Sequence, residues 1–195
     1  MQLPVIHLVR HGETEWSAAG KHTGLTDLPL TPRGEAHAAL LGARLQPLLG
    51  LPAFTSPLRR ASHTAELTGF GTATVDRDLV EWDYGQYEGL TTAAVRETRP
   101  GWELFRDGAP GGETLADVAA RADRVIAKLR ELNSDAVVFA SGHLLRVLAA
   151  RWLGLGPEHG RLFALGTATV SHVGYYHALD EPCLRLWNDA SHLTS

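Results

Sequence analysis

The side chains most suited to chemistry in this chain stand directly after short apolar segments. Arg10 and His11 follow the apolar run at 5–9, and His143 follows a second apolar run at 136–140. Short runs of this kind predict buried strands, as in a parallel sheet that is covered on both faces. Functional side chains of an open α/β sheet gather at the carboxyl ends of its strands. We therefore expect these residues to meet at one edge of a sheet.

Three further residues are candidates for the same edge. Ser141 directly follows the run at 136–140, Arg59 lies at the start of a helix after a strand at 53–55, and Glu81 follows a strand-like apolar pair. Arginine side chains bind oxyanions through paired hydrogen bonds and stay charged at every working pH. Arginines, a histidine and a carboxylate that converge on one point predict a site for a small dianion.

A phosphate monoester is the dianion whose chemistry explains these residue types. Its transferring group spreads charge over three oxygens, which arginine side chains can bind. A neutral imidazole can attack phosphorus and form a covalent intermediate, provided that its other N–H is held, commonly by a backbone carbonyl. A carboxylic acid can protonate the leaving alkoxide, and a bound dianion nearby favours the neutral acid. Because the arginines neutralise the charge, this chemistry requires no metal ion.

Helices are predicted between the strands. Thr31 and Ser56 each precede a proline, a pattern typical of an N-cap and the first helical position, and they predict helices to about residues 49 and 67. Thr114 begins the clearest helix, because apolar residues follow it at spacings of three and four and Asp117 can complete a capping box. Two late strands are expected near 169–176 and 184–187. The alternation predicts an α/β fold, a layered sandwich with a mostly parallel central sheet flanked by helices.

The segment 79–112 interrupts this alternation. It is rich in glycine and proline, and we predict an irregular, cap-like excursion with one short helix near 92–97, inside a single domain of residues 1–195. Aromatic side chains under a long loop usually pack as a satellite of the core, and lining a cleft is the alternative. The aromatic residues concerned are Trp82, Tyr84, Tyr87, Trp102 and Phe105.

Composition excludes several classes of protein. Lys and Arg number 18 and Asp and Glu number 22 among 195 residues, which gives a net charge of −4. A mildly acidic chain binds nucleic acid or an anionic membrane poorly, so neither is an expected partner. No apolar run is long enough to span a bilayer, and no secretory signal is visible. Cys183 is the one cysteine, which excludes an internal disulfide and is typical of a reducing compartment. We therefore expect a cytoplasmic protein.

Five ordered motifs, which together extend over most of the chain, resemble those of the histidine phosphatase superfamily, also called the phosphoglycerate-mutase-like family. The resemblance implies that family's fold, a phosphoryl-transfer activity and no cofactor. The motifs are LVRHGETEW at 8–16, TGLTDLPLT at 23–31, SPLRRA at 56–61, LVEWDYGQYEGL at 79–90 and GET at 112–114.

The resemblance implies a role for each residue that matches the family's pattern. His11 is then the nucleophile that becomes phosphorylated, and Arg10 and Arg59 bind the phosphate. Glu81 is the proton donor, which afterwards acts as base for the attacking water. The remaining implied contacts are with the substrate, and they lie around Thr23 and Gly24.

The last motif departs from the family at one position. The family has a strand ending in His-Gly, with an arginine four residues after the glycine. Gly142 and Arg146 fit this frame, so Ser141 stands where the second catalytic histidine belongs. His143 matches the second histidine of the His-Gly-His found in the acid-phosphatase and sedoheptulose-bisphosphatase branches. We expect Ser141 and His143 to bind the phosphate, although His143 could also be a loop histidine with no contact to substrate.

Other chemistry finds little support in the sequence. His-Glu-x-x-His and Cys-x-x-Cys spacings are absent, so no metal site is predicted. Ser141 lacks the glycine frame of a Gly-x-Ser-x-Gly elbow, which argues against a serine hydrolase. His7 lies in an apolar strand and is expected in the core, whereas His22 is expected on the surface.

Three functions remain open at this stage. The favoured one is a cofactor-independent, metal-independent phosphatase that hydrolyses a small phosphorylated metabolite, such as a phosphorylated sugar. A phosphoglycerate mutase is the second, but similar mutases are usually longer and their acid motif differs from the residues at 84–89. The third is a catalytically impaired protein that binds phosphate esters, which only Ser141 favours. The particular substrate and the oligomeric state do not follow from the sequence.

Overall fold

One central sheet carries the architecture of the computed structural model, which describes residues 3–193. In these residues the sheet has six strands in the order β3-β2-β4-β1-β5-β6. The first four pair in parallel, and β5 and β6 are antiparallel additions. The predicted α/β fold with a mostly parallel sheet is therefore confirmed. The strands are β1 (Ile6–Arg10), β2 (Ala53–Thr55), β3 (Thr74–Val75), β4 (Ala136–Ala140), β5 (Val170–Tyr175) and β6 (Pro182–Asp189).

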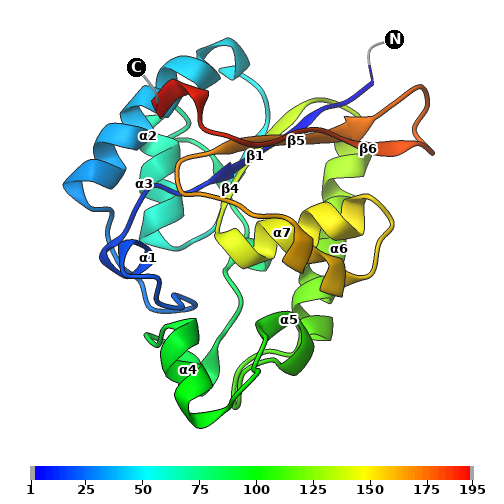
Figure 1. Ribbon diagram of the computed structural model, residues 1–195. Coiled ribbons are helices and arrows are strands. Elements are labelled where there is room, and N and C mark those ends of the chain that lie inside the picture. The colour runs from blue at the N-terminus through cyan, green and yellow to red at the C-terminus, as the bar shows by residue number, and fades with distance from the viewer. Residues whose placement is uncertain (1–2, 194–195) are drawn as a thin grey trace.

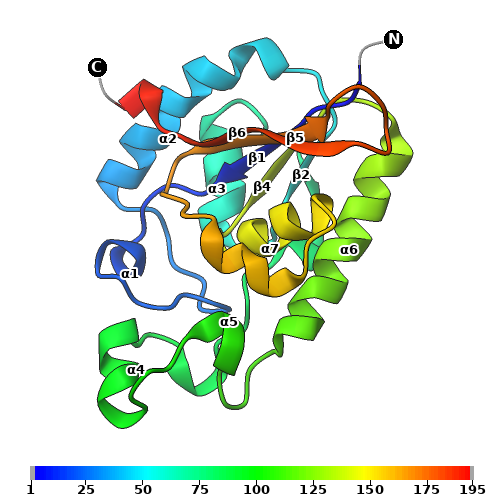
Figure 2. The ribbon, with the colours of Figure 1, turned by 45° about the vertical axis from the view of Figure 1, so that its right-hand side comes forward.

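Helices cover both faces of the sheet, with α2 and α3 on one face and α6 and α7 on the other (Figures 1 and 2). No helix within residues 3–193 is long and apolar enough to cross a membrane. The α-helices are α1 (Glu15–Ala18), α2 (Pro32–Leu45), α3 (Arg59–Leu67), α4 (Thr92–Thr98), α5 (Leu104–Asp107), α6 (Leu115–Leu132) and α7 (Gly142–Trp152). The 3₁₀ turns are η1 (Gln46–Leu48), η2 (Arg77–Leu79), η3 (Gly85–Tyr87), η4 (Pro157–Leu162) and η5 (Ser191–Leu193).

The cap residues explain where the helices begin. The Thr31 side chain accepts a hydrogen bond from the amide of Gly34, and Thr114 forms the expected capping box with Asp117. Ser56 does not cap α3, because that helix begins only at Arg59. Glu81 also follows a 3₁₀ turn rather than the expected strand.

Strand β4 is buried on both faces, and this explains its continuous apolar sequence. Val137 and Phe139 pack with side chains of α2 and α3, and Val138 packs with side chains of α6 and α7. Alternate residues of a strand point to opposite faces, so an uninterrupted apolar run is needed where helices cover both. The sheet is thereby fixed against both helical layers at the strand that leads to Ser141.

The excursion at 79–112 folds as a small lobe that carries α4 and α5 beyond one end of the sheet (Figure 1). The expected short helix near 92–97 is confirmed as α4. Trp82, Tyr84, Trp102 and Phe105 are buried in the same core cluster as α6 and α7, which confirms the interpretation as core. The lobe is therefore attached to the main body by aromatic packing.

Replacing Phe139 with alanine tests the double-sided core. The ring is fully buried and its centroid lies 5.4 Å from that of Phe70. We expect a loss of about 3–5 kcal/mol in the free energy of unfolding, measured by urea denaturation, because the truncation leaves a cavity. Leu162→Ala is the control, since Leu162 is 61% exposed. A change of under about 0.5 kcal/mol, typical of surface substitutions, would contradict the role of Phe139.

Candidate active site

A cavity of about 250 Å³ lies at the carboxyl ends of β1 and β4, between the sheet and the lobe. Its wall includes five of the residues expected from the sequence: Arg10, His11, Thr23, Glu81 and His143. The cavity thus brings together residues from the start, the middle and the last third of the chain. This agrees with the expectation that function gathers at this edge of the sheet.

His11 is held as a neutral imidazole with one orientation. Its side chain is nearly fully buried, and Nδ1 lies 2.7 Å from the backbone carbonyl oxygen of Gly12. A carbonyl oxygen only accepts, so Nδ1 carries the proton and Nε2 keeps its lone pair. Burial lowers the pKa of His11 well below 6.5, and the nearby charges of Arg60 and Arg10 lower it further. These conditions suit a nucleophilic nitrogen.

Arg10 has hydrogen-bond donors that the protein leaves unused. Its Nη1 donates to the carbonyl of Leu165, and its buried Nε has no hydrogen-bond partner among residues 3–193. A Cβ atom on Gly142 would lie 3.2 Å from Arg10 Cζ, so the first residue of α7 must be small for the guanidinium to fit. Buried polar groups are normally paired, so the unpaired Nε of Arg10 is unusual, and the same side chain lines the cavity.

The second arginine at the site is Arg60, and the expectation that placed Arg59 there is wrong. Arg59 is exposed at the start of α3, and its backbone amide donates to Asp27. Arg60 is fully buried, and its charge is one of those that lower the pKa of His11. Successive helix residues are about 100° apart, so only one residue of the pair can face the site. The buried set Arg60, Ala61, Thr64 and Ala65 reveals that face.

Arg60 is tied to the surrounding main chain more than Arg10 is. Its Nε donates to Ser141 Oγ at 3.2 Å. Its two terminal nitrogens donate to the carbonyls of Thr23, Gly24 and Thr26. The guanidinium therefore fixes the loop at 23–26 while its charge stays beside His11.

Gly24 supports the site without lining the cavity. Its amide donates to the carboxylate of Glu88, and a Cβ atom at this position would lie 2.5 Å from the carbonyl oxygen of Trp82. The close approach of the backbone requires glycine here. Of the expected pair, Thr23 is in the cavity wall and Gly24 joins that loop to the lobe.

Glu81 lies at the amino-terminal end of α7, which orients its carboxyl group. Oε1 accepts hydrogen bonds from the amides of Trp82 and Leu144, and Oε2 accepts one from the amide of His143 at 2.9 Å. Free amides at a helix N-terminus attract a carboxylate. Oε2 therefore has one amide partner and Oε1 has two.

His143 contacts the cavity as a neutral ring. Burial lowers its pKa well below 6.5, and the charge of Arg146 lowers it further. Tyr84 Oη lies 2.6 Å from His143 Nδ1, and burial raises the pKa of Tyr84 well above 10. Neither group is therefore charged near neutral pH. His143 does not supply the positive charge that a protonated histidine at position 141 would bring.

Ser141 is buried at the N-cap position of α7, where its hydroxyl accepts from Arg60. It is not in the cavity wall, unlike Gly142 and His143, which follow it. In this structure the contact of Ser141 with the site is the hydrogen bond that it accepts from Arg60.

Several lining residues were not expected from the sequence. His22 was expected on the surface but is 9% exposed, with its ring centroid 4.9 Å from that of Tyr84. Burial lowers the pKa of His22. The loop around His22 has no periodic pattern from which its burial could have been predicted. Arg146, which also lines the cavity, stands at the arginine position of the last motif. Tyr84 is also in the wall, which is the alternative considered for the aromatic residues of the excursion. The remaining residues of the wall are Ser17, Gly20, Lys21, Thr92, Gly142 and Leu165.

The charge of the cavity wall suits a dianion. Arg10, Lys21 and Arg146 contribute +3, so with neutral histidines the wall carries +3 when Glu81 is protonated and +2 when it is ionised. Arg60 adds positive charge behind His11. Within residues 3–193 there is no group of three His, Cys, Asp or Glu residues that could hold a metal ion.

Comparison with known proteins agrees with this geometry. A family model described as "Histidine phosphatase superfamily (branch 1)" matches residues 6–190. An acid phosphatase of Mycobacterium tuberculosis is 43% identical over 176 residues, covering 88% of this chain and 87% of that protein. A sedoheptulose 1,7-bisphosphatase of Saccharomyces cerevisiae is 37% identical over 223 residues, covering 92% of this chain and 82% of that protein. A solved structure from a Mycobacterium tuberculosis open reading frame superimposes with a TM-score of 0.90 and 38% identity, covering 95% and 97% of the two chains.

The adjacent arginines provide a matched test of the site. We expect Arg60→Gln to lower kcat/KM for an aryl phosphate by about 100-fold or more, because a charge-assisted donor in a closed site is lost. Arg59→Gln, one residue away and exposed, should change it by less than about twofold. Circular dichroism spectra would establish that both variants fold. Equal losses in the two variants would contradict the assignment of Arg60.

Proposed function

This chain belongs to the histidine phosphatase superfamily, and we propose that it hydrolyses small phosphate monoesters through a phosphohistidine intermediate at His11. The family and its phosphatase relatives make it a phosphoric monoester hydrolase. One observation carries the proposal: His11 presents a neutral Nε2 beside the guanidinium groups of Arg10 and Arg60. That arrangement places a nucleophile where a phosphoryl group would be held.

The first step transfers the phosphoryl group to His11. Nε2 forms a bond to phosphorus while the ester P–O bond breaks, and the leaving oxygen takes a proton from the Glu81 carboxyl group. The guanidinium of Arg10, which lines the cavity, binds phosphoryl oxygens, and the charge of Arg60 offsets the negative charge that develops. The hydrogen bond that His11 Nδ1 donates to the carbonyl oxygen of Gly12 keeps the imidazole in one orientation during both steps.

The second step releases inorganic phosphate. A water molecule attacks the phosphohistidine and gives its proton to the Glu81 carboxylate, and the P–N bond breaks to restore neutral His11. Glu81 returns to its protonated form and the cycle closes. Charge neutralisation comes from arginines, so no step requires a metal ion.

The substrate class follows from the size of the cavity and from the relatives. About 250 Å³ accommodates a small metabolite, and two relatives are an acid phosphatase and a sugar bisphosphatase. We therefore extend the proposal to phosphorylated sugars and related metabolites. The single cysteine is typical of a cytoplasmic protein, where such substrates are found.

Phosphate release and covalent labelling test this proposal together. In chelator, we expect hydrolysis of p-nitrophenyl phosphate to persist at pH values below 6.5, because the lowered pKa keeps His11 neutral there. Quenching in alkaline detergent should trap a label that is stable in base and labile in acid. His11→Ala should abolish both signals, and His177→Ala, at an exposed position, should abolish neither. Turnover without any label on His11 would refute the intermediate.

Ser141 favours one alternative, a protein that binds phosphate esters and turns them over poorly. Ser141 adds no positive charge to the site, because its hydroxyl, which accepts from Arg60, is neutral. In that case His11 would acquire the label but release phosphate very slowly. Conversion of 3- to 2-phosphoglycerate that depends on a bisphosphate primer would instead indicate a mutase.

Restoring a histidine at position 141 measures what the serine costs. We expect Ser141→His to raise kcat several-fold or more, because an imidazole donor is added beside Arg60 and the phosphoryl oxygens. Ser141→Ala is the control, and it should lower kcat because Arg60 Nε loses its acceptor. If Ser141→His folds and gives no gain with any phosphate ester, the serine is not a catalytic deficit.

A further inference from the structure

A hydrogen bond between the side chains of Tyr84 and His143 lies beside the carboxyl group of Glu81. Tyr84 Oη is 2.6 Å from His143 Nδ1, and the same Nδ1 is 4.0 Å from Glu81 Oε2. All three side chains are in the wall of the catalytic cavity. The steps described above use the carboxyl group of Glu81 and give the hydroxyl of Tyr84 no role.

The proton in this hydrogen bond belongs to the tyrosine. Tyr84 is 2% exposed, and within residues 3–193 its hydroxyl has no hydrogen-bond partner other than His143. A buried hydroxyl is normally paired as a donor, and His143 Nδ1 is the acceptor within reach. A neutral imidazole that accepts at Nδ1 carries its own proton on Nε2. The raised pKa of Tyr84 and the lowered pKa of His143 agree with two neutral groups joined by one proton.

The cavity leaves space for a proton on His143 Nε2. Among residues 3–193 this nitrogen has no hydrogen-bond partner, yet it is not one of the buried unpaired atoms. It therefore reaches the open cavity, where an N–H can be hydrated or can meet a substrate oxygen. A proton on Nδ1 would instead point towards the Tyr84 hydroxyl and Glu81.

The position of that proton affects Glu81, because His143 already donates to Glu81 once. The backbone amide of His143 binds Oε2 at 2.9 Å, and two further amides bind Oε1. Every hydrogen bond donated to a carboxylate favours its ionised form, whereas a bound phosphate dianion favours the protonated acid. A fourth donor, from the imidazole of His143 to Oε2, would leave less of the protonated acid that the first step needs.

We propose that Tyr84 is a positioning residue, which holds His143 in the Nε2–H tautomer and so prevents its ring from donating to Glu81. Glu81 then keeps its proton for the leaving oxygen, which takes the proton as the ester P–O bond breaks. The inference rests on the proposed function, because it needs Glu81 to be the proton donor.

Two aryl phosphates with different leaving groups test this role. The p-nitrophenolate ion is weakly basic and leaves with little help from an acid, whereas the more basic phenolate ion depends on protonation. We expect Tyr84→Phe to lower kcat/KM by about tenfold or more for phenyl phosphate and by less than about threefold for p-nitrophenyl phosphate. Equal losses on the two esters would overturn the proposal, because a purely structural role of Tyr84 does not depend on the leaving group.

Two further variants calibrate this measurement. Glu81→Gln should reduce activity on phenyl phosphate relative to p-nitrophenyl phosphate by more than Tyr84→Phe does, because it removes the acid itself. Tyr87→Phe is the matched control, since Tyr87 packs against Trp102 and is not in the wall of the catalytic cavity. It removes the same hydroxyl group from the lobe and should leave the ratio unchanged.

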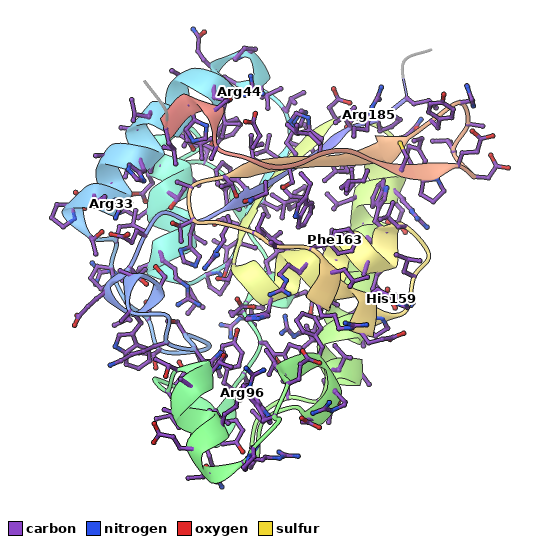
Figure 3. The ribbon with its side chains drawn as sticks, in the orientation of Figure 1. Arg33, Arg44, Arg96, His159, Phe163 and Arg185 are labelled. Atoms are coloured by element: carbon purple, nitrogen blue, oxygen red, sulfur yellow. The ribbon has the colours of Figure 1, made fainter. Side chains whose placement is uncertain are left out.

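NMR of the full chain with isotope-labelled histidine reads the tautomer directly, because protonated and unprotonated ring nitrogens differ in chemical shift. The signals of His143 are those lost in His143→Gln. We expect the Nε2–H form in the unaltered chain and the Nδ1–H form in Tyr84→Phe. His159 on η4 (Figure 3) is the internal reference, because its ring contacts Gly156 and Glu158 close by in the chain. An Nδ1–H form in the unaltered chain, or the same tautomer in both proteins, would overturn the proposal.

The outcomes separate this inference from the proposed function. If Glu81→Gln depends on the leaving group and Tyr84→Phe does not, Glu81 is the acid and only the role of Tyr84 is wrong. If Glu81→Gln loses equally on both esters, the proton donor has been misassigned, and this inference fails with it. Failure to hydrolyse either ester, with no label on His11, would refute the proposed function as a whole.

Discussion

The buried positive charge beside His11 is the constraint on which the rest of the site depends. Arg60 is fully buried, and a buried charge is tolerated only when its hydrogen bonds are satisfied. The protein meets this requirement with Ser141 and three backbone carbonyls from the loop at 23–26. The same charge helps to hold the pKa of His11 low, so one buried group both shapes the loop and keeps the nucleophile neutral.

The amino-terminal end of α7 is the second organising feature, because it joins the lobe to the sheet. Glu81 comes from the excursion, yet its carboxyl group is held by amides at the start of α7. Gly142 begins that helix and makes room for Arg10, which ends β1. His11, Arg10 and Glu81, which carry the proposed mechanism, are thus positioned by one strand end and one helix start. Aromatic packing of the lobe then prevents Glu81 from moving away.

The sequence was informative wherever a local rule determines the structure. Apolar runs predicted β1 and β4, and threonine caps predicted where α2 and α6 begin, because burial and capping depend on neighbouring residues. Strand β3 and the burial of His22 depend on distant contacts and had no local signal. The choice between Arg59 and Arg60 depended on where α3 begins, and a shift of that start rotates every side chain about the helix axis. The motif at 56–61 therefore identified α3 as the helix that carries the second arginine, but it did not decide between Arg59 and Arg60.

Ser141, which stands where the family has its second histidine, changes the hydrogen bonds that its neighbours make. A histidine there could donate to the phosphate, whereas the serine hydroxyl accepts from Arg60 and occupies one of that arginine's donors. Arg10 lines the cavity, whereas Arg60 does not, so the proposed mechanism gives the phosphoryl oxygens to Arg10. His143 is neutral and cannot replace the lost charge.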